Sequence, residues 1–213
     1  RYILGPEVKK FEEEFANFCE SKYSGGVASG TCALHLVLRA LNLKKGDEVI
    51  TAPNSFIASA SSIALVGAKP VFADIRDDGN IDPKKIEEAI TDKTKVIMPV
   101  HLTGRPARMP EIMSIAKKYS LSVVEDAAQA VGAKIKGRSV GSWGDAACFS
   151  LHPLKNLHAF GDGGMVTSNH IDLINLLYKS RNHGLENREQ CDFWAHNCRL
   201  DEIHASMLRV QLR

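Results

Sequence analysis

The chain has 213 residues, 44% of them hydrophobic, so it can bury a full core as one large domain or two small ones. Its 27 basic and 25 acidic residues give a net charge of +2, and the basic residues are scattered, which argues against a partner that is nucleic acid or an anionic membrane. No apolar run approaches about 18 residues, so we expect no membrane span.

Segments with helical and with strand periodicity alternate along the chain. Helices are expected at residues 7–23, 31–43, 55–66, 83–90, 110–119, 171–180 and 200–213. Strands are expected at 48–52, 69–75, 95–102, 121–125, 146–151 and 165–167. This alternation predicts an α/β fold with three layers, in which helices cover both faces of a mainly parallel central sheet.

No linker or internal repeat interrupts residues 1–213, so one domain is the simplest organisation. The expected helix 200–213 stops in the middle of its pattern without a capping residue, which suggests that the sequence is part of a longer protein. The first residues lack the features of a signal peptide, and the odd number of cysteines shows no paired spacing. We therefore expect a reduced, cytoplasmic protein.

Ligands of parallel α/β sheets bind at the carboxyl ends of the strands, and several candidate residues fall at such places. Ser29-Gly30-Thr31 precedes an expected helix, whose N–H groups and dipole favour an anion such as phosphate. A plain helix cap is the alternative explanation, and for these residues taken alone it is the more frequent one. Asp126 follows a strand and could hold a protonated ring nitrogen, or it could cap a turn. Phe56 could stack on a flat ring or belong to the core.

Lys155 lies between two apolar strands and just ahead of a glycine cluster at 161–164. Burial disfavours a charged amine, which suits a nucleophile that forms a Schiff base with an aldehyde, although a solvated loop lysine is the alternative. Ser150, five residues earlier, could bind phosphate or be an ordinary strand serine. Acid–base or structural roles are both open for three histidines, His152, His158 and His183.

Other chemistries find little support in the sequence. Four residues near the end of the chain could be metal ligands by type, but their spacing matches no zinc motif: Cys191, His196, Cys198 and His204. We therefore expect no metal site. A nucleophile elbow, a Walker loop and a dinucleotide fingerprint are also absent, which argues against hydrolase, ATPase and dinucleotide-binding functions.

In order and spacing, the candidates resemble the DegT/DnrJ/StrS family of sugar aminotransferases, which use pyridoxal 5′-phosphate and have the aspartate aminotransferase fold (fold type I). The resemblance covers essentially the whole chain. It rests on Ser29-Gly30-Thr31, Phe56, Asp126-x-x-Gln129 and Ser150-x-x-x-x-Lys155, and on the runs at 5–8, 66–72, 125–129, 161–164, 181–184 and 197–202.

The resemblance implies a role for each matching residue. Lys155 would form the Schiff base with the cofactor and carry protons, and Asp126 would pair with the pyridinium nitrogen. Gln129 would lie near the 3′-oxygen of the cofactor, and Phe56 would stack on its ring. The phosphate would bind to Gly30, Thr31 and Ser150.

The resemblance also implies a homodimer, because Asn197 matches an asparagine that reaches the phosphate of the neighbouring subunit. His196 departs from the family, which usually has a tyrosine near this position. The family continues beyond Arg213 with a small C-terminal domain, so residues 1–213 would be the large cofactor-binding domain.

The implied activity is transamination of a nucleotide-linked keto-sugar, of the 3- or 4-keto-6-deoxyhexose type, with an amino acid such as glutamate as donor. It would belong to deoxyamino-sugar biosynthesis for a surface polysaccharide or a glycosylated metabolite. Two alternatives stay open. A related sugar dehydratase usually has histidine where Lys155 stands, so Lys155 argues against it, and a non-catalytic regulatory or binding member is the other.

Overall fold

The computed structural model describes residues 2–213, and in these residues seven strands form one sheet in the order β1-β9-β8-β5-β4-β2-β3. β9 is antiparallel to β1 and β8, and the other neighbouring pairs are parallel. The predicted mainly parallel sheet is therefore confirmed. The strands are β1 (Tyr23–Val27), β2 (Glu48–Thr51), β3 (Lys69–Phe72), β4 (Thr94–Met98), β5 (Ser122–Asp126), β8 (Ala146–Ser150) and β9 (Gly164–Ser168).

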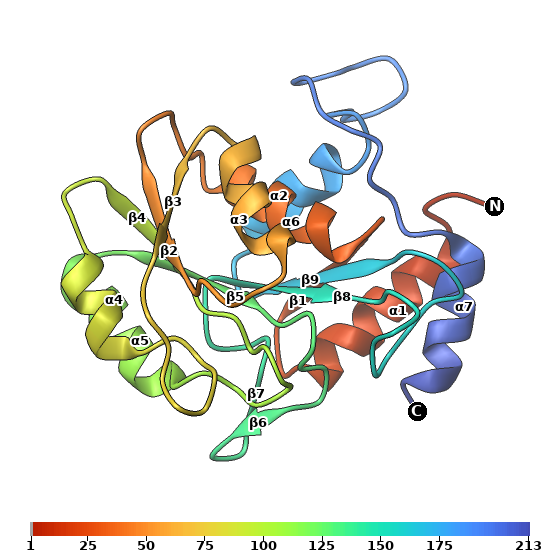
Figure 1. The fold of residues 1–213 in the computed structure, drawn as a ribbon. Coiled ribbons are helices and arrows are strands. Elements are labelled where there is room, and N and C mark those ends of the chain that lie inside the picture. The colour runs from red at the N-terminus through yellow and green to blue at the C-terminus, as the bar shows by residue number, and fades with distance from the viewer. Residues whose placement is uncertain (1) are drawn as a thin grey trace.

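Helices cover both faces of this sheet, so the predicted three layers are confirmed (Figure 1). One face carries α2 (Gly30–Ala40), α3 (Ile57–Leu65) and α6 (Ile171–Ser180). The opposite face carries α1 (Pro6–Phe18), α4 (Pro83–Ala89), α5 (Met109–Tyr119) and α7 (Glu202–Gln211). Within residues 2–213, no helix is both long enough and apolar enough to cross a membrane.

Neighbouring residues of a strand face opposite layers, which is how one sheet supports two cores. In β8, Ala146 and Cys148 pack beneath α2 and α6. Ala147 and Phe149 face the other way, into the core formed with α1 and α7. There the ring of Phe149 meets Phe15 edge-on, with 5.1 Å between the ring centroids. The continuous apolar run in the sequence therefore reflects burial on both faces.

The expected helix 7–23 is wrong at its end, because α1 stops at Phe18 and Tyr23–Val27 forms strand β1. Glycines are poor strand formers, so Gly25 and Gly26 hide this strand in the sequence. Close packing nevertheless requires glycine at both positions. A Cβ on Gly25 would lie 2.7 Å from a methyl carbon of Leu177, and one on Gly26 would be similarly crowded. A short hairpin, β6 (Lys134–Ile135) and β7 (Arg138–Ser139), was also not predicted.

The two ends of the described chain are joined through Glu202, the first residue of α7. Its carboxylate accepts hydrogen bonds from the backbone N–H groups of Gly5 (2.7 Å), Glu7 (3.1 Å) and Val8 (2.9 Å). These are N–H groups at the start of α1 that a helix cannot satisfy internally. A carboxylate of α7 thus caps α1, and the two helices lie side by side (Figure 1).

A buried ion pair links α1, β1 and the end of α6. The guanidinium of Arg181 donates through Nη1 to Glu12 Oε1 and to the carbonyl oxygen of Gly26 (2.6 Å). The N–H of Gly26 donates to the same Glu12 oxygen at 2.8 Å. Burial raises the pKa of the Glu12 carboxyl group, and the charge and hydrogen bond of Arg181 work against this rise.

We expect Arg181→Met to lower the free energy of unfolding at pH 7 by about 3 kcal/mol, because it leaves the Glu12 carboxylate buried and unpaired. The pKa of Glu12 then rises further, so the folded state binds its proton more tightly than the unfolded chain does. The stability of the variant should therefore fall as the pH increases from 5 to 7. Urea unfolding at the two pH values measures both effects.

Arg209→Met is the matched control, because Arg209 forms its ion pairs with Glu7 and Glu14 at the partly exposed surface. We expect a much smaller loss of stability for this variant, since solvent screens such pairs. Equal losses for the two variants, or a loss for Arg181→Met that does not depend on pH, would contradict this view of the buried pair.

Candidate active site

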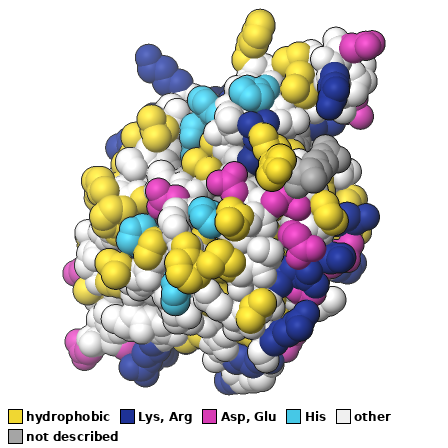
Figure 2. Space-filling view, turned by 90° about the vertical axis from the view of Figure 1, so that its right-hand side faces the viewer, with side chains coloured by type: hydrophobic (Ala, Val, Ile, Leu, Met, Phe, Trp, Pro, Cys, Tyr) yellow, Lys and Arg dark blue, Asp and Glu magenta, His cyan; other side chains and the backbone are white. Residues whose placement is uncertain are grey.

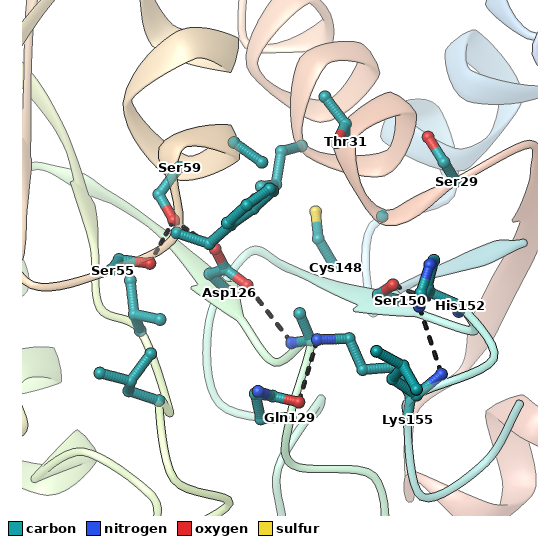
Figure 3. Close-up of a pocket in the computed structure, with 18 of the residues that line it drawn as sticks. Ser29, Thr31, Ser55, Ser59, Asp126, Gln129, Cys148, Ser150, His152 and Lys155 are labelled. Atoms are coloured by element: carbon teal, nitrogen blue, oxygen red, sulfur yellow. Dashed lines mark hydrogen bonds between the residues drawn. The ribbon is translucent and has the colours of Figure 1, made fainter. Parts of the chain in front are cut away.

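A pocket of about 460 Å³ opens where the carboxyl ends of β5 and β8 meet the N-terminus of α2. Figure 3 places Ser59 and Asp126 on one side of it and Thr31 and Ser150 on the other. The sequence-predicted site residues that line this pocket are Gly30, Thr31, Phe56, Asp126, Gln129, Ser150 and Lys155. Asn197 does not line it.

Asp126 is the last residue of β5, and only 4% of its surface is exposed. The hydroxyl of Ser59 donates to Asp126 Oδ2 at 2.7 Å, and the backbone N–H of Ala128 donates to Oδ1 at 3.3 Å. The second bond is the turn cap that the sequence left open as an alternative. Burial raises the pKa of this carboxyl group, and the two hydrogen bonds and the nearby charge of Lys155 oppose the rise.

Ser59 is a site residue that the sequence did not reveal. It lies in α3, a helix of small residues without a motif, and it is 2% exposed. Its hydroxyl also contacts the hydroxyl of Ser55 at 2.7 Å, so the two serines form a chain that ends on Asp126 (Figure 3). A polar residue on the buried face of a helix was the only available signal, because such a residue needs a partner.

The residue before Asp126 is fixed by a second buried network. Glu125 accepts hydrogen bonds from the backbone N–H groups of Gly141, Trp143 and Gly144, and it lies 3.2 Å from Nε2 of His101. His101 Nδ1 accepts from a backbone N–H at 3.0 Å, so its proton belongs on Nε2, facing Glu125. This network holds the end of β5 in place.

The N-terminus of α2 forms the opposite side of the pocket. The side chain of Ser29 caps the helix by accepting from the N–H of Cys32 at 3.1 Å, so the capping interpretation holds for Ser29. The first N–H groups of the helix, at Gly30 and Thr31, have no intrahelical partner. A Cβ on Gly30 would lie 2.7 Å from Cβ of Ser150, so only glycine lets α2 approach the end of β8 this closely. This cradle suits an anion of phosphate size.

Lys155 is half-buried in the loop after β8, and its amine donates to the side-chain oxygen of Gln129 at 3.0 Å. Both side chains reach the pocket between its two sides (Figure 3). The lysine is therefore not the freely solvated loop residue that the sequence left open. A basic amine lies in a cavity that also holds a buried acid and an anion cradle.

Of the remaining candidates, some line the pocket and others do not. Phe56 is 75% exposed and lines the pocket, so the alternative of a core phenylalanine is wrong. His152 also lines the pocket, whereas His158 and His183 do not. Asn197 is exposed and pairs with Asn182 in an isolated bridge, away from the pocket of its own chain.

Metal ligation finds no support in residues 2–213, where no three His, Cys, Asp or Glu side chains are grouped to hold an ion. The five cysteines in this part of the chain are free thiols.

With this geometry established, comparison with known proteins identifies the family. The DegT/DnrJ/EryC1/StrS aminotransferase family matches residues 1–213. The chain belongs to this family.

Three curated relatives illustrate the similarity. The dTDP-3-amino-3,6-dideoxy-alpha-D-galactopyranose transaminase of Aneurinibacillus thermoaerophilus is 50% identical over 99% of this chain and 58% of its own length. The UDP-N-acetyl-3-dehydro-alpha-D-glucosamine 3-aminotransferase of Acidithiobacillus ferrooxidans is 48% identical (99% and 57%). The pleiotropic regulatory protein of Geobacillus stearothermophilus is 47% identical (99% and 57%). The chain thus spans somewhat more than half the length of these relatives.

Solved structures of the family agree with the fold. DesV of S. venezuelae superposes with a TM-score of 0.97 at 43% identity, covering 100% of this chain and 57% of DesV. NtdA of Bacillus subtilis, solved with bound cofactor PMP, gives a TM-score of 0.93 at 32% identity, covering 100% of this chain and 49% of NtdA. The predicted fold class, including the resemblance to the pyridoxal-phosphate aminotransferases, is confirmed.

We expect Ser59→Ala to raise the pKa of Asp126, because the hydroxyl that stabilises its charged form is lost. Carbon-13 NMR titration of the aspartate carboxyl groups in the cofactor-free protein measures this change. The matched control is Ser62→Ala in the same helix. Ser62 is fully buried, but its hydroxyl donates to the carbonyl oxygen of Ser59 and not to Asp126. Equal shifts of the Asp126 pKa in the two variants would show that Ser59 acts only through packing.

Proposed function

We propose that this chain is the cofactor-binding part of an aminotransferase that uses pyridoxal 5′-phosphate to transfer an amino group to a nucleotide-linked keto-sugar. The observation that carries the proposal is the buried carboxylate of Asp126, which shares one pocket with the amine of Lys155 and with the anion cradle of α2. Each of these groups matches one part of the cofactor.

The residues fit the cofactor on physical grounds. A buried carboxylate with a raised pKa is stabilised by a cationic hydrogen-bond donor, and a protonated pyridine nitrogen is one. The cradle of Gly30, Thr31 and Ser150 presents N–H and hydroxyl donors to a phosphate. The exposed ring of Phe56 offers a flat apolar face to the pyridine ring.

When bound, pyridoxal phosphate supplies an aldehyde that condenses with amines and a ring that accepts the electron pair left on the substrate carbon. Lys155 would hold the aldehyde through its amine, and its Nζ would accept and return a proton as a general base and acid. Asp126 would hold a proton on the ring nitrogen, because its buried carboxylate would pair with the cationic ring. Gln129 orients the Lys155 amine through their hydrogen bond.

The substrate proposal rests on the relatives. Two of them are named for amination at carbon 3, of a dTDP-linked and a UDP-linked sugar. We therefore propose a 3-keto-sugar nucleotide as acceptor and glutamate as donor, in deoxyamino-sugar biosynthesis. Residues 1–213 would be the large domain, and the small domain of the family would complete the sugar pocket.

The Lys155→Ala variant tests this function directly. We expect the purified full-length protein to turn yellow with pyridoxal phosphate and to bleach when glutamate is added, and we expect Lys155→Ala to show neither change. Absorbance spectra in the visible range measure both. Lys134→Ala is the control, because Lys134 lies on the β6–β7 hairpin in an exposed ion pair with Glu20. A visible band that persists in Lys155→Ala would contradict the role of this lysine.

A regulatory or binding function is the second candidate, because one relative is named a pleiotropic regulatory protein. The visible absorbance spectra described above distinguish the regulatory function from the aminotransferase function. A protein that becomes yellow but does not bleach with any amino donor would favour the regulatory function. A protein that bleaches with glutamate and is restored by a keto-sugar nucleotide would establish the transaminase.

We further propose that two copies of the protein share each active site. Asn197 lies outside the pocket of its own chain and is exposed, so it is free to reach another subunit. Hydrophobic side chains also remain on the face that carries α7 (Figure 2). On α7 itself, the large apolar side chains of Ile203 and Val210 are exposed (67% and 71%), and a second subunit would cover them.

Mixing two inactive variants tests the shared site. Lys155→Ala removes the amine, and Asn197→Asp would place a negative charge against the phosphate of the neighbouring subunit. In a mixed dimer, one of the two sites has neither change, so random re-association should restore about a quarter of the wild-type activity. Each variant re-associated with itself is the control. A mixture that stays inactive would show that each site is built from one chain.

A further inference from the structure

The side chain of His101 is fully buried next to the active-site pocket but does not line it. Its neighbours in the chain, Val100 and Leu102, both line the pocket. The imidazole ring instead meets the carboxylate of Glu125, which is also fully buried, with 3.2 Å between Nε2 and Oε2. A buried histidine and a buried carboxylate therefore meet at the residue before Asp126, and the proposed reaction uses neither of them.

His101 contacts both of the last two residues of β5. Its Nδ1 accepts from the backbone N–H of Ala107 at 3.0 Å, so the ring proton is on Nε2 and is donated to Glu125. The backbone N–H of His101 donates to the carbonyl oxygen of Asp126 at 3.0 Å. His101 thus holds Glu125 through its ring and Asp126 through its backbone.

The Glu125 carboxylate needs the donor that His101 supplies. Its other donors are the backbone N–H groups of Gly141 (3.2 Å), Trp143 (3.0 Å) and Gly144 (3.1 Å). A carboxylate offers about four acceptor positions, so these bonds and the one from His101 satisfy it. Without the histidine, one position of a buried carboxylate would be unpaired, which is costly. Glu125 could reduce that cost only by moving, and the end of β5 would move with it.

The carboxyl group of Asp126 depends on the position of this strand end. It accepts from the hydroxyl of Ser59 at 2.7 Å and from the N–H of Ala128 at 3.3 Å. The second distance is already at the long end of the range for a hydrogen bond, so a small displacement would break that bond. Both bonds favour the charged form of Asp126 and so oppose the rise of its pKa that burial causes.

We propose that His101 is a positioning residue of the active site, which acts on Asp126 through Glu125. Its bond to Glu125 fixes the end of β5, so that the Asp126 carboxyl group meets the hydroxyl of Ser59 and faces the pocket where the cofactor ring would bind. The effect of His101 on turnover rests on the proposed transamination. Its effect on Asp126 does not, because that effect can be measured without the cofactor.

Two substitutions separate the two bonds of the ring. The amide nitrogen of glutamine can replace Nε2, so His101→Gln keeps a donor for Glu125 and loses the acceptor for Ala107. The side-chain oxygen of asparagine can replace Nδ1, so His101→Asn does the reverse. In the cofactor-free full-length protein, we expect the pKa of Asp126 to rise in His101→Asn and to stay at the wild-type value in His101→Gln. Carbon-13 NMR titration of labelled aspartates measures this pKa, and the spectrum of Asp126→Asn assigns the signal.

Thr51→Val is the matched control. The buried hydroxyl of Thr51 donates to the carbonyl oxygen of Met98 at 2.9 Å, at the same end of the sheet but without contact to Glu125 or Asp126. Its loss should leave the pKa of Asp126 unchanged. In the enzyme loaded with cofactor, we expect His101→Asn to lower kcat for transamination from glutamate by up to about 100-fold, because the acid is displaced, with little change in KM for glutamate. His101→Gln should keep most of the activity.

A pKa of Asp126 that changes equally in the two His101 variants, or more in His101→Gln, would overturn the proposal, because His101 would then act only by holding its own loop. If His101→Asn does not fold, His101→Gln alone decides, since the account requires a wild-type pKa for Asp126 in that variant. If the wild-type protein does not transaminate, the proposed function fails, and the comparison of pKa values still decides whether His101 positions Asp126.

Discussion

The active-site region depends on one energetic constraint, the burial of the Asp126 carboxyl group at the end of β5. A buried carboxylate is stable only when hydrogen bonds and opposite charge compensate it. Ser59 supplies a short hydrogen bond, and Lys155 supplies a positive charge from the facing loop. A cofactor with a protonated ring nitrogen would complete this compensation, which is why we regard the site as built to hold such a ring.

The topology of the sheet brings these groups together although they are distant in the sequence. β5 lies at the centre of the sheet, between β4 and β8, so its carboxyl end lies beside the end of β8 and the N-terminus of α2. Gly30 allows the close approach of α2 to Ser150. The strand that runs in the opposite direction, β9, closes the loop of Lys155 back onto the sheet. The cradle, the acid and the amine are therefore positioned by separate elements of one rigid framework.

Most helices and strands, and several of the residues that line the pocket, could be predicted from the sequence, because periodicity and the motifs at strand ends are local features of the chain. The periodicity of residues 171–180 predicted the bounds of α6 correctly. Strand β1 was missed because packing, and not strand propensity, selects its glycines. Ser59 was missed because its role depends on a tertiary neighbour, Asp126, that no local pattern shows. The roles of the site residues stay predictions.

Borohydride trapping tests the central claim most directly. The full-length protein is incubated with pyridoxal phosphate, reduced with sodium borohydride, digested and sequenced by mass spectrometry. Our account predicts that the cofactor is attached to Lys155, at the position where the amine shares a pocket with Asp126 and the α2 cradle. Attachment to a different lysine, or a protein that carries no cofactor after reduction, would contradict it.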